Sequence, residues 1–160
     1  MPETALTSSK PEERLKELGL TLPSPPKPLA SYIPWVRTGN LVFVAGQLPM
    51  RDGKCAFTGK LGRDMNVAKG QEAAVVACHN VLGILREALG TLDKVRKIVR
   101  VVGHVNCAPG FTDVHLVTNG ASDLLGLVFG ERGKHSRLSL GAAELPLNAT
   151  FELEVIAEVE

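Results

Sequence analysis

The sequence predicts an α+β domain in which two main helices pack on one face of a mixed β-sheet. β-prone segments and segments of helical periodicity follow one another in the order strand, strand, helix, strand, helix, strand, strand, which is typical of this class. The chain has 160 residues, 44% of them hydrophobic, and this is enough to bury one core. It contains no internal repeat. A single domain is therefore expected.

The first 29 residues are interpreted as an N-terminal arm that precedes this domain at residues 30 to 160. Residues 1 to 9 are small and polar and are expected to be frayed. The segment from Pro11 to Leu18 predicts a short helix, with proline near its start and Gly19 at its end. The prolines that follow indicate an extended surface segment, because proline cannot pair inside a sheet.

The domain begins with a predicted β-hairpin. Residues 32 to 36 and 41 to 45 are apolar and β-prone, and Arg-Thr-Gly-Asn at residues 37 to 40 has the composition of a turn. A loop containing glycine and lysine is expected from residue 51 to residue 63.

The middle of the chain predicts helix, strand, helix. Residues 67 to 89 carry apolar side chains at alternating spacings of four and three, which predicts a helix with one buried stripe that ends at Gly90. Residues 95 to 106 are rich in valine and are expected to form a long strand. Residues 111 to 129 return to helical spacing in their later part, before Gly130.

Two alternating runs between residues 135 and 160 are separated by a turn at residues 145 to 148. This pattern predicts a pair of adjacent antiparallel strands. In the second run, alternate side chains from Phe151 to Val159 are apolar and form a core face. In the first run Arg137 lies on the face opposite Leu138, and such an isolated cation needs a partner.

These segments carry motifs of a known family. Arg-x-Ser-x-Gly from Arg137, Glu-Leu-Pro from Glu144 and Glu-x-Glu-x-Ile-Ala from Glu152 resemble the signature of the YjgF-type reactive-intermediate deaminase (Rid) family, some of whose members carry an L-PSP endoribonuclease label. Gly-Gln-Leu-Pro from Gly46 also matches, and the resemblance spans about residues 30 to 159. It implies a chorismate-mutase-like fold, no cofactor, and a homotrimer with ligand clefts between subunits.

By this resemblance, Arg137 binds the substrate carboxylate and Glu152 orients or activates the attacking water. A guanidinium can hold a carboxylate through two parallel hydrogen bonds, and a desolvated glutamate with a raised pKa can act as a base. The residues alone leave other interpretations open. Arg137 could pair with a strand glutamate or lie on a solvated edge, and Glu152 could be an ordinary exposed strand residue.

The resemblance adds Tyr32, Gly46, Asn119 and Ser139 to the substrate site. Three of these residues could instead have a purely structural role. Tyr32 could pack as part of the core, Gly46 could mark a bulge or a strand end, and Asn119 could cap the second helix at its start.

The chain departs from the family pattern beside Arg137. Leu138 follows the arginine where serine or threonine is usual, and His135-Ser136 precedes it in place of Pro-Ala. A few residues also appear inserted before Asn119. His135 could tune substrate specificity or could be solvated surface.

Composition argues against several other functions. The net charge of +1 and 4% aromatic residues give no support for nucleic-acid binding, and the basic residues between Lys94 and Arg100 do not all share a strand face. The four histidines show no short ligand spacing, so no metal is expected. Three widely spaced cysteines indicate a reduced compartment, and we expect a cytoplasmic protein without a signal or membrane segment.

The sequence therefore predicts a hydrolase that converts small 2-imino or enamine acids to 2-keto acids and ammonia. Its expected partners are a small carboxylate substrate and two further copies of the chain. Two alternatives remain open. One is a trimeric sensor that binds a small carboxylate without turnover, and the other is a dedicated catabolic deaminase for an aminomuconate-like enamine.

Overall fold

The computed structural model describes residues 7–25 and 30–160. The predicted frayed terminus and the proline-rich lead-in fall partly on residues 1–6 and 26–29, which lie outside the described residues. Within the described ranges, no helix has both the length and the apolar character needed to cross a membrane.

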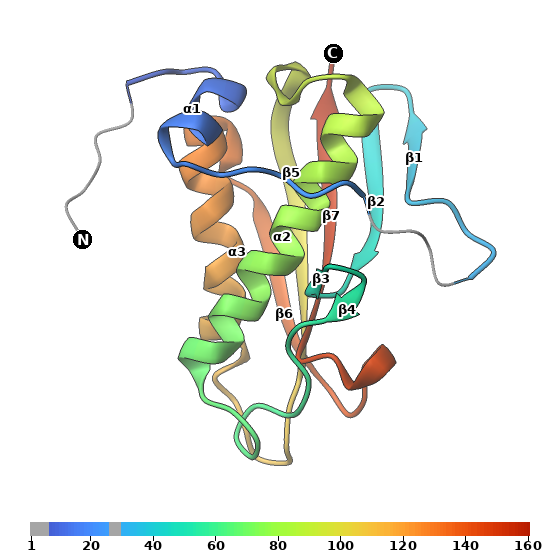
Figure 1. Ribbon diagram of the computed structural model, residues 1–160, viewed down its shortest axis with the longest axis vertical. Coiled ribbons are helices and arrows are strands. Elements are labelled where there is room, and N and C mark those ends of the chain that lie inside the picture. The colour runs from blue at the N-terminus through green and yellow to red at the C-terminus, as the bar shows by residue number, and fades with distance from the viewer. Residues whose placement is uncertain (1–6, 26–29) are drawn as a thin grey trace.

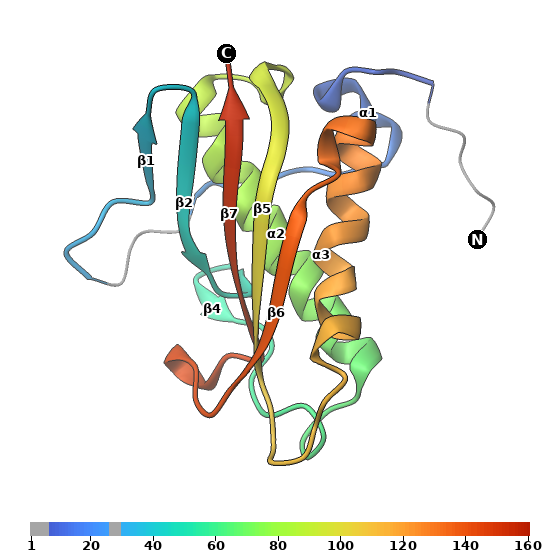
Figure 2. The same ribbon diagram turned by 180° about the vertical axis from the view of Figure 1, so that it is seen from behind.

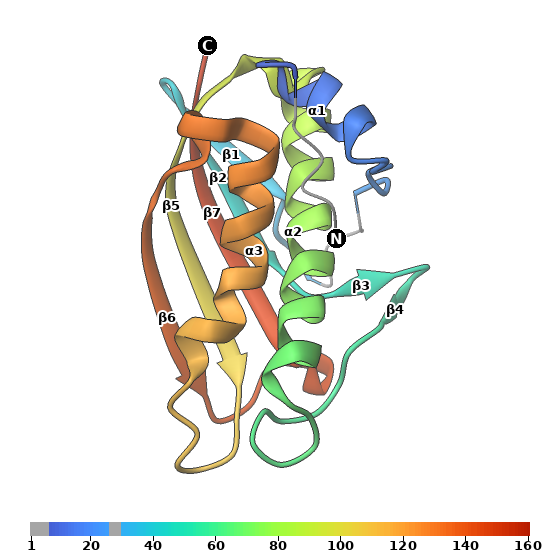
Figure 3. The same ribbon diagram turned by 90° about the vertical axis from the view of Figure 1, so that its left-hand side faces the viewer.

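The sheet has five strands with helices on one face, as Figures 1 and 3 show. Its strand order is β1-β2-β7-β5-β6. The strand bounds are Trp35–Thr38 for β1, Leu41–Gln47 for β2, Val95–Asn106 for β5, Ser136–Ala142 for β6 and Phe151–Val159 for β7. Helices α2 (Val67–Leu89) and α3 (Val114–Phe129) form the covering layer, so the predicted α+β class is confirmed.

The predicted hairpin between the last two strands is wrong. β5 lies between β6 and β7, as the rear view in Figure 2 shows. β6 runs parallel to β5 because α3 carries the chain back over the sheet, and β7 then pairs antiparallel with β5 and β2. Alternation in a sequence indicates which side chains share a face, but it does not identify the neighbouring strand.

The first predicted hairpin is present, with a shift at its start. β1 and β2 pair antiparallel around Gly39, which has a φ of 56°. β1 begins at Trp35 rather than Tyr32, because Pro34 directly before it has no N–H to donate to a neighbouring strand. At the start of the predicted loop, β3 (Met50–Arg51) and β4 (Lys54–Cys55) form a small ribbon around Asp52-Gly53, a turn signal that our prediction missed.

The core lies between the helical layer and the sheet. The apolar stripe predicted for α2 is buried except for Ala88, which is partly exposed, and the alternate β7 side chains from Phe151 to Val159 are buried. The Asn66 side chain caps the start of α2 by accepting a hydrogen bond from the Lys69 N–H at 3.0 Å, and Gly90 ends the helix with a φ of 80°. The predicted bounds of α2 and β5 agree with the structure.

The short helix α1 (Pro11–Glu17) packs on the outside of this layer at one end of the molecule. Leu15 is only 1% exposed. The Glu12 carboxylate accepts hydrogen bonds from Arg86 Nε at 3.0 Å and Nη2 at 2.6 Å, and from the Leu92 N–H at 2.9 Å. The short 3₁₀ helices η1 (Leu92–Lys94), η2 (Gly130–Gly133) and η3 (Pro146–Asn148) complete the fold.

Candidate functional site

Arg137 projects from the edge strand β6 towards helix α3. Its register partner on β5 is Val101, whose side chain is in the core, so Arg137 lies on the helix side of the sheet. The guanidinium donates hydrogen bonds from Nη1 to Asn119 Oδ1 at 2.7 Å and to Ser122 Oγ at 3.2 Å. It also donates from Nη2 to the His115 carbonyl at 3.2 Å. The isolated cation of β6 is therefore held by neutral acceptors of α3.

These contacts leave part of the Arg137 guanidinium available. An arginine has five N–H groups, and the three contacts use three of them. Nε–H and one N–H of Nη2 have no acceptor among the described residues, and the side chain is exposed. A fixed, exposed guanidinium with two free donors is suited to binding an anion, and a carboxylate in particular.

Asn119 lies beside Arg137, although its place in α3 differs from the prediction. We expected it at the start of the helix, but α3 begins at Val114 and Asn119 lies inside it. Its side chain therefore does not cap the helix and is used to hold Arg137. Ser139 lies on the same face of β6, two residues along, and its Oγ is buried without a hydrogen-bond partner in the described part of the chain.

Ser122 and His135 complete this cluster. Ser122 Oγ lies 2.9 Å from His135 Nε2, and His135 Nδ1 lies 2.6 Å from the Gly133 carbonyl oxygen. Sequence reasoning considered His135 only for specificity and overlooked Ser122. The available signal was spacing, because Asn119 and Ser122 are three residues apart and face the same way on a helix.

Glu152 occupies a different environment on the opposite face of the sheet. It is paired in register with His104 on β5, whereas the neighbouring Phe151 and Leu153 point into the core. Burial raises the pKa of Glu152, with a smaller opposing effect from His104. The close approach of Gly46 contributes to this burial, because a Cβ at that position would lie 2.5 Å from Glu152 Oε1. The structure therefore brings Glu152 and Gly46 together.

The two groups of predicted site residues do not meet within one chain. Arg137 and Glu152 lie on opposite faces, with β5 between their strands. Arg137 on β6 and Val155 on β7 both pair in register with Val101 on β5. Glu152 lies three residues before Val155 on β7. Two strand spacings of about 4.8 Å and three residues of about 3.4 Å put the two Cα atoms roughly 14 Å apart. Tyr32 is 47% exposed and lies outside the strands.

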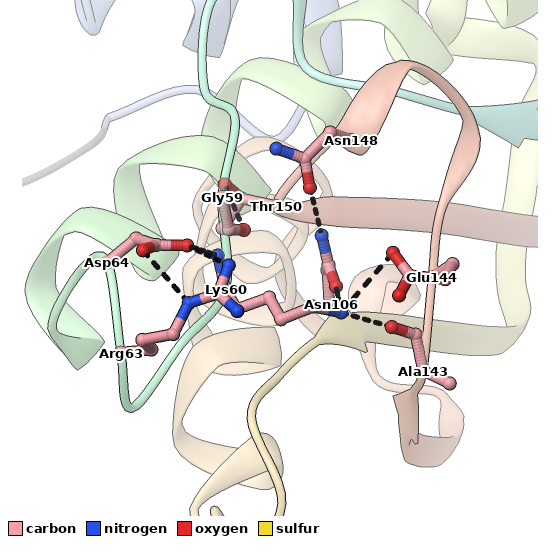
Figure 4. Close-up of polar contacts among 9 residues, drawn as sticks. All are labelled: Gly59, Lys60, Arg63, Asp64, Asn106, Ala143, Glu144, Asn148 and Thr150. Carbon is pink, nitrogen blue, oxygen red and sulfur yellow. Dashed lines mark hydrogen bonds and ion pairs between the residues drawn. The ribbon is translucent and has the colours of Figure 1, made fainter.

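A second polar cluster surrounds Lys60, drawn in Figure 4. Lys60 is 9% exposed, and its Nζ donates to Asn106 Oδ1 at 2.7 Å and to the Ala143 carbonyl, with Glu144 Oε2 at 3.4 Å. Asn106 in turn donates to Asn148 Oδ1 at 3.1 Å. The three protons of the ammonium thus face three acceptors, and the side chain ties the loop before α2 to the ends of β5 and β6.

The described residues contain no group of three histidine, cysteine, aspartate or glutamate side chains placed to hold a metal ion.

Comparison with known proteins agrees with the fold and the motifs. A family model described as "YjgF/chorismate mutase-like, putative endoribonuclease" matches residues 12–159. The chain belongs to this family. Protein TCP17 of Trypanosoma cruzi is 38% identical to this YjgF-like chain over 157 residues, which cover 98% of each protein. A RutC family protein of Pyrococcus abyssi is 29% identical over 135 residues, covering 84% of this chain and 91% of that protein.

Solved structures match this YjgF-like chain over nearly its whole length. The crystal structure of protein Atu1372 from Agrobacterium tumefaciens, described as of unknown function, has a TM-score of 0.87 and 46% sequence identity. The match covers 94% of this chain and 92% of that one. The sequence-based resemblance to the YjgF-type family is therefore confirmed.

Proposed function

We propose that this YjgF-like protein hydrolyses small 2-imino or enamine acids to 2-keto acids and ammonia without a cofactor. The observation that carries the proposal is the exposed Arg137 guanidinium, held in place by Asn119, Ser122 and the His115 carbonyl and left with two free donors. Such a group can fix the carboxylate of a small substrate and so orient the carbon next to it.

Glu152 handles the attacking water in this proposal. Its burial supports the role, because a raised pKa brings a carboxylate closer to the range in which it accepts a proton efficiently. Gly46 supports it as well, since any side chain there would displace the carboxylate.

The separation of Arg137 and Glu152 leads us to propose a site that is completed between subunits. A small acid held on Arg137 cannot reach Glu152 of the same chain through the sheet. A homotrimer with clefts between copies, as the family resemblance implies, would let Arg137 of one copy meet Glu152 of the next. Exposed apolar side chains on the helix-free face support such association. They are Val36, Phe43, Leu138 and Leu140.

The first experiment measures ammonia release from 2-iminopropanoate and 2-iminobutanoate generated in situ. The wild type should accelerate release, and Arg137→Ala should lose about 2 to 5 kcal/mol of substrate interaction. Arg137→Lys keeps the charge but not the two-pronged geometry and should recover only part of the activity. Arg51→Ala, at an exposed arginine of β3, is the matched control and should behave as wild type. Unchanged activity of Arg137→Ala would contradict the proposed role.

Mixed trimers test whether the site is shared. Arg137→Ala and Glu152→Gln subunits are each inactive alone in this proposal. If each site takes Arg137 from one copy and Glu152 from the next, a random equal mixture should regain about a quarter of wild-type activity. If both residues act in one chain, the mixture stays inactive. The distinction requires no knowledge of the physiological substrate.

A carboxylate sensor is the second candidate. It is favoured by the fact that Arg137 is fully positioned by its own chain, whereas Glu152 is not beside it. A sensor would gain thermal stability with pyruvate or 2-oxobutanoate, would lose that gain in Arg137→Ala, and would release no ammonia from either imine. A dedicated catabolic deaminase would instead release ammonia from an aminomuconate-like enamine offered in the same assay.

A further inference from the structure

Three ionisable side chains lie together on the helix-free face of the sheet. His104 on β5 is paired in register with Glu152 on β7, and Glu154 lies two residues along β7 on the same face. His104 lowers the pKa of Glu152 and Glu154 raises it, and both effects are smaller than that of burial. The neighbouring strands add only the uncharged Leu140 beside His104 and Gly46 beside Glu152.

The contact with Glu154 orients the His104 ring. His104 Nε2 lies 2.7 Å from Glu154 Oε2, and an ionised carboxylate can only accept, so Nε2 carries a proton and donates it. The other ring nitrogen, Nδ1, makes no hydrogen bond within the described ranges and is not sealed from solvent, since the side chain is 29% exposed. Nδ1 is therefore open to a molecule that binds on this face.

A small acid that contacts Glu152 also reaches His104. The Cβ atoms of directly opposed strand residues are about 5 Å apart, which is similar to the length of a 2-imino acid of three or four carbons. The reacting carbon and the nitrogen of such an acid are bonded to each other. Glu152 can therefore take a proton from the water that attacks the carbon while His104 serves the nitrogen.

We propose that His104, oriented by Glu154, is the acid that protonates the departing amine nitrogen, with Glu152 as the base. This inference rests on the proposed function and deepens it, because it adds a second proton-transfer group to the same site. Glu152 still handles the water, and Arg137 of the neighbouring copy still holds the carboxylate. His104 is a catalytic residue in this scheme, whereas Glu154 is a positioning residue that acts through it.

The two groups account for every proton of the reaction. Water attacks the iminium carbon while Glu152 takes one of its protons, and the second electron pair of the C=N bond moves to nitrogen. The His104 imidazolium then donates its Nδ1 proton to the amine nitrogen of the carbinolamine. The C–N bond breaks with its electron pair on nitrogen, and the hydroxyl proton passes to His104. Glu152 returns its proton to the released ammonia, so the products are the 2-keto acid and ammonium.

The pH dependence of kcat for ammonia release tests this assignment. In the wild type kcat should fall at low pH as Glu152 gains a proton, and at high pH as His104 loses one. His104→Gln should lower kcat roughly a hundredfold and abolish the high-pH fall, because an amide cannot act as an acid. KM should change less than about threefold, because Arg137 is untouched.

Two further variants separate the catalytic residue from its positioning partner. Glu154→Gln should lower kcat by less than His104→Gln does, because the ring loses its orientation but keeps its acid group. Glu158→Gln, on the same face of β7 but further along the strand, is the matched control and should behave as wild type.

Two outcomes would overturn the acid role. One is an unchanged kcat, or an unchanged fall of kcat at high pH, in His104→Gln. The other is a loss of activity that occurs only where size-exclusion chromatography shows that the oligomer has dissociated, which would mean that His104 supports association alone. If the wild type itself releases no ammonia, the proposed function fails, and this result differs from an active wild type matched by an equally active His104→Gln.

Nitrogen-15 NMR of the His104 ring tests the contact without catalysis. Addition of 2-oxobutanoate should shift the Nδ1 resonance more than the Nε2 resonance, because Glu154 still holds Nε2. In Glu154→Gln the Nε2 resonance should move before any acid is added. A response of the Arg137 guanidinium to 2-oxobutanoate without a response at Nδ1 would rule out the acid role.

Discussion

Arg137 and Lys60 are both cations held by oxygen atoms of their own chain, but they differ in which of their N–H groups remain free. Lys60 is 9% exposed, and its three protons face Asn106 Oδ1, the Ala143 carbonyl and Glu144. Arg137 is exposed and keeps two N–H groups without acceptors in the described ranges. The hollow of ≈ 480 Å³ beside Lys60 therefore receives no free donor from its ammonium.

This difference separates a structural cation from a binding cation. A buried ammonium with every proton engaged stabilises the segments that it connects, and removing it leaves buried acceptors without a donor. A fixed arginine with free donors at the surface adds little to stability but can bind an anion at low entropic cost. We therefore expect that replacing Lys60 lowers the stability of the protein, whereas replacing Arg137 lowers its activity.

The largest stability effect is expected for Lys60→Met. The substitution keeps most of the side-chain volume but removes the donor to Asn106 Oδ1 and to the Ala143 carbonyl, and should cost about 2–4 kcal/mol of the free energy of unfolding. Chemical denaturation measures it. Lys54→Met, at an exposed lysine of β4, is the control and should cost little. Arg137→Ala should leave the free energy of unfolding close to wild type, and a loss as large as that of Lys60→Met would refute the comparison.

A smaller effect is expected for Asn119→Ala. It removes the 2.7 Å acceptor of Arg137 Nη1 and lets the guanidinium move, so KM for an imine acid should rise roughly tenfold, or about 1–2 kcal/mol. Asn119→Asp sharpens the test. It keeps the acceptor but neutralises the cation, so substrate binding should weaken although Arg137 stays in place. Unchanged KM in both variants would mean that Arg137 needs no fixing by α3.

The smallest effect concerns Glu152, which unlike Lys60 is half-buried with no hydrogen bond to its carboxylate among the described residues. Because burial raises the pKa of Glu152 in the folded state, the protonated form is the favoured one there. The wild type should lose stability as the pH rises through that pKa. Glu152→Gln should therefore have a slightly higher Tm at neutral pH and no advantage below the ordinary pKa of 4.5. Thermal melts across pH measure this difference, and an equal gain at all pH values would contradict it.

Part of the candidate site could be predicted from the sequence. The resemblance pointed to Arg137, Glu152 and Gly46. In the structure Arg137 is held by α3, and Glu152 is half-buried against Gly46. Ser122 was missed because its spacing of three residues from Asn119 is informative only once the strand facing that side of the helix is known. It is significant only because β6 returns beside α3 and brings His135 within 2.9 Å.

The sequence by itself determined the order of the main sheet strands and the two long helices, the bounds of α2 and β5 and the buried face of β7. These follow from local periodicity and from glycine and asparagine at helix ends. Only the tertiary structure decided that β5 separates β6 from β7, and thereby that Arg137 and Glu152 lie on opposite faces. Alternation fixes which side chains share a face, whereas strand neighbours depend on how the whole chain closes its core.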